Sequence, residues 1–444
     1  MSTKKLHQRL ISVLIPASAL LLVNPAQAEN LTEVYQLALE NAPELRAALA
    51  SKAAVNEGID QSNALYRPNI SFNAGYQFSA DETDTSAGSI SGDYNTLSYS
   101  LNLSQPLYRH DYTLQKRQAS IQAEQAEAQY NATQQALALN VAQRYFDTLA
   151  AQDSLAFAQA EKEAIKRQLE QTKQRFEVGL IAITDVHESQ AAYDMAVASE
   201  IGAQVQQSVA QEALREIIGQ DLTSTLAGLG ENMKLIAPSP NNRDQWVATA
   251  QQKNFQLSAF QAAVRNAQQQ LEQHRTHRRP TVDLVASHGY NDTGGGFLGE
   301  RQSTSTSVGV QLNVPLYQGG AISSRVRQAQ YQLDQAKENL EQQRRSVQRN
   351  ASDAFLHVQA NISRVNALEQ AVLSSKSALA ATEAGYDVGT RTTVDVLDVR
   401  RNLFRAQRDY ARARYDYIIA TLRLKQASGL LNAEDIQLIN AWLR

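Results

Sequence analysis

The sequence predicts a mixed α and β membrane protein, in which strands contribute to a transmembrane β-barrel and long helices form coiled coils. Three observations lead to this fold class. One unit occurs twice along the chain, each copy holds a pair of segments with a period of two, and each copy holds a long stretch without a helix breaker. Both strands and long helices are therefore expected in each copy.

The N-terminus has the pattern of a secretory signal peptide. Basic residues precede an apolar stretch from Leu10 to Val23, and Ala26-Gln27-Ala28 follows as a small-residue cleavage pattern. A signal anchor is the alternative, but Pro16 interrupts the apolar stretch, which is also short for a bilayer. We expect residues 1–28 to be a signal peptide and the mature chain to begin near Glu29.

Composition excludes several classes of protein. The chain has no cysteine, which excludes disulfides, thiolate metal sites and a lipid anchor on an N-terminal cysteine. No second apolar segment of 18 residues or more follows, so no transmembrane helix is expected. The formal net charge is −3 and the basic residues look scattered rather than gathered into one stripe, so nucleic acid is not expected as a partner.

An internal duplication sets the domain organisation. The copies begin near Leu31 and Arg243, and the opening helical stretch of each ends at an Arg-Pro pair. Later motifs keep one constant offset, since Phe176-Glu177-Val178-Gly179 matches Tyr386-Asp387-Val388-Gly389. We expect a signal peptide at 1–28, a first repeat at 29–221, a linker or equatorial element at 222–242, a second repeat at 243–430 and a C-terminal equatorial segment at 431–444.

Each copy has the pattern of a β-hairpin, at 69–104 and at 281–314. Apolar and polar residues alternate, and the segments of each pair are joined by loops expected from Ala80 to Asp93 and from Asn291 to Gln302. A half-buried sheet of a soluble protein shows the same alternation. Strands of about ten residues suit a tilted bilayer crossing, and the export signal favours a membrane barrel over a soluble sheet. Four strands cannot close a barrel, since the smallest have about eight, so several chains must share one.

Long helices follow each hairpin. From Leu107 to Val178 nothing breaks a helix, and the stretch can reach about 105 Å. Its counterpart runs from about Ala321 to Val388. A seven-residue spacing then marks an antiparallel coiled-coil seam in the second copy, through Val358, Val365, Val372, Leu379 and Tyr386 and back through Val396, Leu403, Tyr410, Tyr417 and Leu424. In the first copy, Lys162 and Glu200 interrupt the seam.

At this point the mature chain resembles the TolC family of outer-membrane efflux proteins over essentially its whole length. The motifs that carry the resemblance are Glu29-Asn30-Leu31, Gln174-Arg175-Phe176, Val178-Gly179-Leu180, Ala182-Ile183-Thr184-Asp185-Val186, Tyr317-Gln318-Gly319-Gly320, Ala384-Gly385-Tyr386, Val388-Gly389-Thr390-Arg391 and Val394-Asp395-Val396-Leu397-Asp398. The resemblance implies a homotrimer with one 12-stranded barrel in the outer membrane, four strands coming from each chain. A periplasmic tunnel of long helices would continue from that barrel.

The same resemblance implies a passive channel for efflux of small molecules and for type I secretion of proteins. A periplasmic adaptor and an inner-membrane transporter of the RND, ABC or MFS class would dock onto the tips and supply the energy. Neither an enzymatic activity nor a cofactor is expected. The adaptor contacts would fall on the two turns, at Val178, Gly179, Leu180, Val388, Gly389 and Thr390. A plain helix C-cap explains the two glycines as well.

By the same resemblance, a latch would hold the tips closed. Arg391 would bond to Thr184 and Asp185, Tyr386 to Asp185, and Glu383 to Gln168. For Tyr386, packing in the seam is the alternative, because this residue also keeps the seven-residue spacing.

Asp395 and Asp398 would form the acidic constriction of the family. Three copies would give a ring of carboxylates that favours cations. The alternative is that the acids stabilise a helix N-terminus, and Asp185 and Glu188 form a corresponding pair in the first copy.

His274 and His277 are not expected to bind a metal, because no third ligand lies near them in the sequence. The rival interpretation of the whole chain is a periplasmic coiled-coil structural or adaptor protein. That interpretation leaves the alternating strands unexplained.

Overall fold

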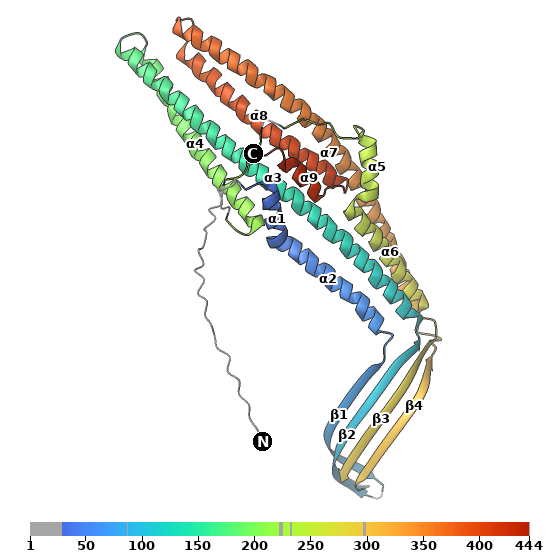
Figure 1. Cartoon of the computed structure of the whole chain (residues 1–444). Coiled ribbons are helices and arrows are strands. Elements are labelled where there is room, and N and C mark those ends of the chain that lie inside the picture. Colours follow the sequence, from blue (N-terminus) through green and yellow to red (C-terminus); the bar gives the residue numbers. More distant parts are fainter. Residues whose placement is uncertain (1–28, 87, 222–224, 231–232, 296–298, 444) are drawn as a thin grey trace, which may run out of the picture.

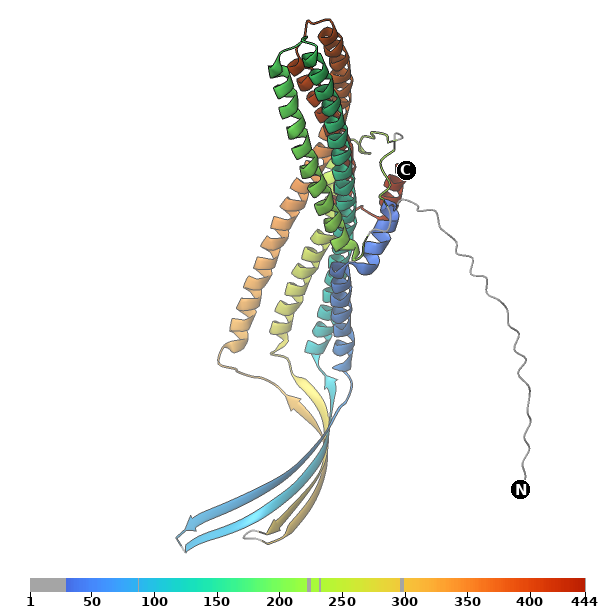
Figure 2. The same cartoon turned by 90° about the vertical axis from the view of Figure 1, so that its left-hand side faces the viewer.

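The computed structural model describes residues 29–86, 88–221, 225–230, 233–295 and 299–443. The predicted signal peptide at 1–28 and part of the predicted linker at 222–242 lie outside these ranges. The molecule is elongated: the helices form one long body, and the strands extend from its end (Figures 1 and 2). Within the described residues, no helix is both long enough and apolar enough to cross a membrane.

The same order of elements occurs twice. The first set is α1 (Leu31–Asn41), α2 (Pro43–Ala64), β1 (Asn69–Thr85), β2 (Gly88–Tyr108), α3 (His110–Glu177) and α4 (Ile183–Ile218). The second set is α5 (Arg243–Lys253), α6 (Phe255–Thr276), β3 (Thr281–Gly295), β4 (Arg301–Asn313), α7 (Ala321–Asp387) and α8 (Thr393–Ala427), and α9 (Ala433–Asn440) follows.

Each opening helical stretch is divided in two, which the sequence pattern did not predict. Pro43 begins α2 because it has no N–H to donate to the preceding turn. In the second copy, Asn254 accepts a hydrogen bond from the Leu257 backbone N–H and so starts α6.

The four strands form one antiparallel sheet in the order β1-β2-β3-β4. The strands contain 13 to 21 residues, more than the ten expected. The predicted loop from Ala80 to Asp93 is wrong, because these residues continue the β1–β2 ladder to Thr85 and Gly88. The predicted loop from Asn291 to Gln302 is likewise shortened at both ends. Backbone pairing needs no apolar side chain, so a Ser/Asp/Gly-rich strand looks like a loop in sequence.

The alternation predicted for the strands is confirmed, and its apolar face is uncovered. Phe72, Tyr76 and Phe78 of β1 are each about two-thirds exposed, and Val308 of β4 is 73% exposed. Residues of the opposite face of β1, such as Ser71 and Asn73, are exposed as well. The sheet therefore has no packed core of its own within one chain.

The long helices are confirmed as predicted: α3 has 68 residues and α7 has 67, so each spans about 100 Å. The seam of the second copy is also confirmed, since none of its ten residues is exposed and Val358, Val396 and Tyr417 are almost fully buried. In the first copy, the two interrupting residues pair with each other, with Lys162 Nζ 2.6 Å from Glu200 Oε2.

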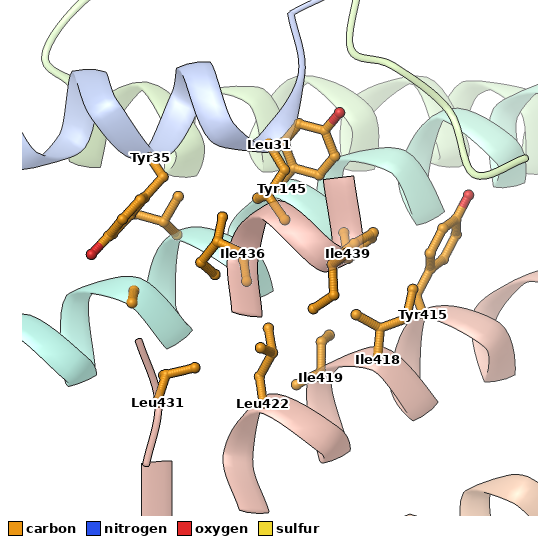
Figure 3. Close-up of a cluster of buried hydrophobic side chains, with 14 of the residues drawn as sticks. Leu31, Tyr35, Tyr145, Tyr415, Ile418, Ile419, Leu422, Leu431, Ile436 and Ile439 are labelled. Carbon is orange, nitrogen blue, oxygen red and sulfur yellow. The ribbon is translucent and has the colours of Figure 1, made fainter. Parts of the chain in front are cut away.

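The largest core lies at the middle of the helical body, where α1, α3, α8 and α9 meet (Figure 3). Tyr145 is completely buried, and its hydroxyl donates to the Ala227 carbonyl at 2.8 Å. Tyr417 likewise donates to the Ile236 carbonyl at 2.9 Å. These bonds attach the segment after α4 to the helices. The described part of the chain between the two copies is therefore packed against the helical body and is not a free linker.

Candidate functional site

The candidate site is the pair of helical tips where α3 turns into α4 and α7 turns into α8. Both turns have the same geometry. Gly179 (φ 78°) and Gly389 (φ 79°) take the left-handed conformation, which costs a residue with a side chain more than it costs glycine. The next residue bonds back to the helix: Leu180 N–H to Arg175 and Thr390 N–H to Gly385. This pattern is a Schellman motif, so the helix C-cap interpretation of the two glycines is correct.

The turns also present apolar side chains to solvent. Val178, Leu180 and Val388 are 70%, 72% and 75% exposed. Thr390 differs, because its hydroxyl donates to the Gly385 carbonyl at 3.0 Å. Three exposed aliphatic side chains on two adjacent turns suit a surface that another protein covers.

The helices that leave the tips begin differently. In α8, Thr392 and Asp395 form a reciprocal capping box, with the Asp395 carboxylate accepting from the Thr392 N–H at 2.9 Å. These hydrogen bonds lower the pKa of Asp395. In α4, the N-cap is Ala182, which has no side chain that can accept. In the part of the chain that the structure describes, the Asp185 carboxylate forms no cap either, although it occupies the position that corresponds to Asp395.

Within one chain, Asp395 serves as a helix-capping residue, as the alternative interpretation predicted. Asp398 is exposed and lies 3.6 Å from Arg401, one turn further along α8. Asp395 is half-buried and Asp398 is exposed at the start of the helix, and among the described residues neither carboxylate is paired with a buried cation.

Tyr386 is buried between the two hairpins. The Arg175 guanidinium of α3 lies 4.6 Å from the centre of its ring, and the same arginine is 3.2 Å from Asp387. The Tyr386 hydroxyl accepts from Thr393 at 3.4 Å. Seam packing, the alternative interpretation of Tyr386, therefore applies within one chain.

The predicted latch bonds are not formed within one described chain. No hydrogen bond or ion pair joins Arg391 to Thr184 or Asp185, or Tyr386 to Asp185, in the ranges that the structure covers. The predicted bond between Glu383 and Gln168 is also absent there. Glu383 is instead paired with Arg400 at 2.5 Å, and the buried amide nitrogen of Gln168 has no partner.

Sequence reasoning missed Arg175 and Arg400. A signal for Arg400 was present, because the seam pairs Tyr386 with Val396 and Leu379 with Leu403. In that antiparallel register Glu383 lies opposite residue 399, next to Arg400. Arg175 acts between hairpins, and no local pattern indicates that contact.

The prediction of scattered basic residues is wrong for α8. Arg401, Arg405, Arg408 and Arg412 recur at intervals of three and four and share one helix face. Arg412 pairs with Asp147 at 2.8 Å, so the stripe is partly neutralised by α3.

The two histidines discounted as ligands lie with ring centres 5.6 Å apart, and burial lowers the pKa of His274. Among the described residues, no group of three or more His, Cys, Asp or Glu side chains is arranged to hold a metal ion.

Comparisons with known proteins agree on one family. The family model described as outer membrane efflux protein matches residues 34–220 and 246–430. The chain is 39% identical to the outer membrane protein TolC of Vibrio cholerae, over 98% of this chain and 99% of that protein. It is 39% identical to the TolC protein of Escherichia coli (98% and 89%) and 30% identical to the alkaline protease secretion protein AprF of Pseudomonas aeruginosa (98% and 91%).

Solved structures share the fold. The Campylobacter jejuni CmeC outer membrane channel superposes with a TM-score of 0.79 at 17% identity, over 94% of this chain and 90% of that one. The VceC outer membrane protein of Vibrio cholerae gives a TM-score of 0.75 at 21% identity, over 90% and 96%.

Proposed function

Since this chain belongs to the outer membrane efflux protein family, we propose that three copies assemble into one channel-tunnel. The chain is an outer-membrane channel protein for efflux and type I secretion, as its TolC and protease-secretion relatives indicate. The family consists of channel proteins and not of enzymes. We also propose which partners this assembly binds and which residues form its gate.

The uncovered sheet is the observation that carries the proposal. Within the described chain, β1 pairs with β2 alone and β4 with β3 alone, so both edges present unpaired backbone groups. A membrane does not tolerate such edges, and four strands are too few to close on themselves. Three chains with β1 of one against β4 of the next give 12 strands and no edge. The exposed apolar face then contacts lipid, and the polar face lines a water-filled lumen.

The helices extend the lumen into the periplasm. Their apolar seams are narrow and their remaining faces polar, which suits a wall with water on both sides. We propose that repeats 29–221 and 243–430 arose by duplication and contribute equivalent parts of this wall. The segments at 222–242 and 431–444 would form a belt around its middle.

The two turns would contact a periplasmic adaptor through Val178, Leu180 and Val388, with Gly179, Gly389 and Thr390 shaping the turns. An inner-membrane transporter of the RND, ABC or MFS class would supply the energy, because the channel itself is passive.

The gate would be closed by contacts between chains. The Asp185 carboxylate does not cap α4, so it is available to Arg391 of a neighbouring copy. Thr184 precedes Asp185 in the sequence, and Tyr386 lies at the tip of the other hairpin. Asp395 and Asp398 from three copies would form a ring of six carboxylates that favours cations.

Single-channel recording in planar bilayers tests the proposal. The native protein is expected to give a small, cation-preferring conductance, and a variant with Tyr386→Phe and Arg391→Ala a larger one. Asp395→Asn with Asp398→Asn should reduce the cation preference without opening the gate. Arg423→Gln, an exposed change far from the tips, is the matched control. A folded oligomer that forms no channel would contradict the proposal and favour a structural coiled-coil role.

A further inference from the structure

Arg400 joins three helices near the tips. From α8, its Nη2 donates to Glu383 of α7 at 2.5 Å, and its Nη1 donates to the Ala164 carbonyl of α3 at 3.1 Å. Its side chain is 15% exposed. By contrast, Arg401, Arg408 and Arg412 on the same helix are 43–50% exposed. Arg400 is therefore held in one place by both hairpins.

Arg400 also takes the partner that was expected for Gln168. Ala164, whose carbonyl accepts from Arg400, lies one helical turn before Gln168 on α3. Glu383, the partner that the family resemblance assigned to Gln168, is bound to Arg400 instead. Gln168 itself is buried, and its amide nitrogen has no hydrogen-bond partner among the described residues.

We propose that Arg400 is a further closing residue of the gate, which replaces the direct bond between Gln168 and Glu383 with a charged bridge between the hairpins. The inference rests on the proposed channel function. A guanidinium suits this role because its fixed fork donates to a carboxylate and a carbonyl at once. The bond to Glu383 stays within the α7–α8 hairpin, whereas the bond to Ala164 ties that hairpin to α3.

The Arg400 bridge can break and re-form without exposing apolar side chains, whereas separating a coiled-coil seam exposes them. Separating α8 from α3 breaks one hydrogen bond to a main-chain carbonyl, which already accepts from its own helix. Arg400 keeps its pairing with Glu383 during that separation, so no buried charge is left alone. The hairpin can therefore move as one unit.

Channel recording of two variants tests the inference. Arg400→Gln is expected to raise the occupancy of the high-conductance state roughly tenfold, which is about 1.4 kcal/mol. Arg400→Lys should fall between this variant and the native protein, since one ammonium cannot reproduce both bonds. Arg423→Gln removes the same charge from the same helix at an exposed site and should have no effect. Unchanged gating in Arg400→Gln, while Arg391→Ala opens the channel, overturns the inference and leaves the channel intact.

A second measurement does not depend on conductance. The chain has no cysteine, so spin labels can be placed only at Val178→Cys and Val388→Cys, and electron–electron distances between the tips can be recorded. Arg400→Gln is expected to shift the distribution to longer distances than Arg423→Gln does. Identical distributions in the two variants would contradict the bridge even if no channel were recorded.

Discussion

The α3–α4 and α7–α8 hairpins have the same turn but are held together differently. Their glycines have nearly the same φ, and both turns close with the same pair of backbone hydrogen bonds. The seam of α7–α8 is apolar, with Val372 and Tyr410 in one layer. At the corresponding positions of α3–α4 stand Lys162 and Glu200, which form an ion pair. The return helix is capped by Thr392 in one hairpin, whereas Ala182 gives no cap in the other.

This comparison teaches that the shape of a tip and its rigidity have separate causes. The turn follows from a glycine and backbone hydrogen bonds alone, so it survives sequence divergence between the copies. Rigidity follows from the seam and the cap, and there the copies differ. We expect α7–α8 to be the stiffer hairpin and α3–α4 to depend more on its neighbours.

The largest difference should come from matched truncations in the two seams. Val396→Ala in α8 removes two methyl groups from a side chain that is 1% exposed, and should lower the free energy of unfolding by about 2–3 kcal/mol. Val186→Ala, at the corresponding half-buried position of α4, should cost less than half of this. Urea unfolding in detergent, followed by the helical circular dichroism signal, measures both. Equal losses would show that the two seams are equally tight.

The two turns should respond alike. Gly389→Ala and Gly179→Ala each place a side chain in the left-handed region, at a cost of about 1–2 kcal/mol. No atom lies within 4 Å of the added Cβ in either case, so backbone strain is the only expected cause. The same unfolding measurement gives both values. A difference above the error would mean that the turns are not equivalent.

Much of this fold could be predicted from the sequence, because periodicity reports which faces are buried. The seam through Val358 and Val396, the long helices and the alternating strands all follow from such patterns. The extension of β1 beyond Ala80 to Thr85, and the start of β2 at Gly88 rather than at Asp93, could not be predicted, because backbone groups hold a polar ladder and leave no trace in the side-chain pattern. At the site, the glycine turns at Gly179 and Gly389 could be predicted as helix C-caps, but the Arg400 bridge depends on contacts between elements far apart in the chain.

The caps should produce a smaller and pH-dependent difference. Thr392→Ala removes the capping box of α8 and should cost about 1 kcal/mol near neutral pH. Because the bonds of Thr392 lower the pKa of Asp395, the stabilisation is complete above the ordinary aspartate pKa of 3.8 and is lost as the pH falls through the lower folded value. The difference in unfolding free energy between native and variant proteins should therefore be smaller at strongly acid pH than at neutral pH, and the hydrogen bond from the Asp395 N–H to the Thr392 hydroxyl accounts for the part that remains. A difference of the same size at both pH values would assign the whole effect to that hydroxyl.

The converse change, Ala182→Thr, should stabilise α4, because the new side chain would cap the helix and bind Asp185. The gain should be smaller than the stabilisation that Thr392 gives α8. The Asp185 carboxylate would then no longer be available to Arg391, so the channel should open more readily although the hairpin is more stable. Single-channel recording beside the unfolding curve separates the two effects. Greater stability with unchanged gating would remove Asp185 from the latch.

The smallest expected effect concerns the ion pair itself. Replacing Lys162 and Glu200 together by Val and Tyr gives α3–α4 the layer found in α7–α8, and should raise the melting temperature slightly. Each single replacement should lower it, because it leaves one partly covered charge without its partner. The sign of the coupling between the two replacements is thus the informative quantity, and thermal melts of the native, single and double variants provide it. If the double variant melts below both single ones, the polar layer is required for the packing of this hairpin, and its looser seam is then a feature that the fold maintains.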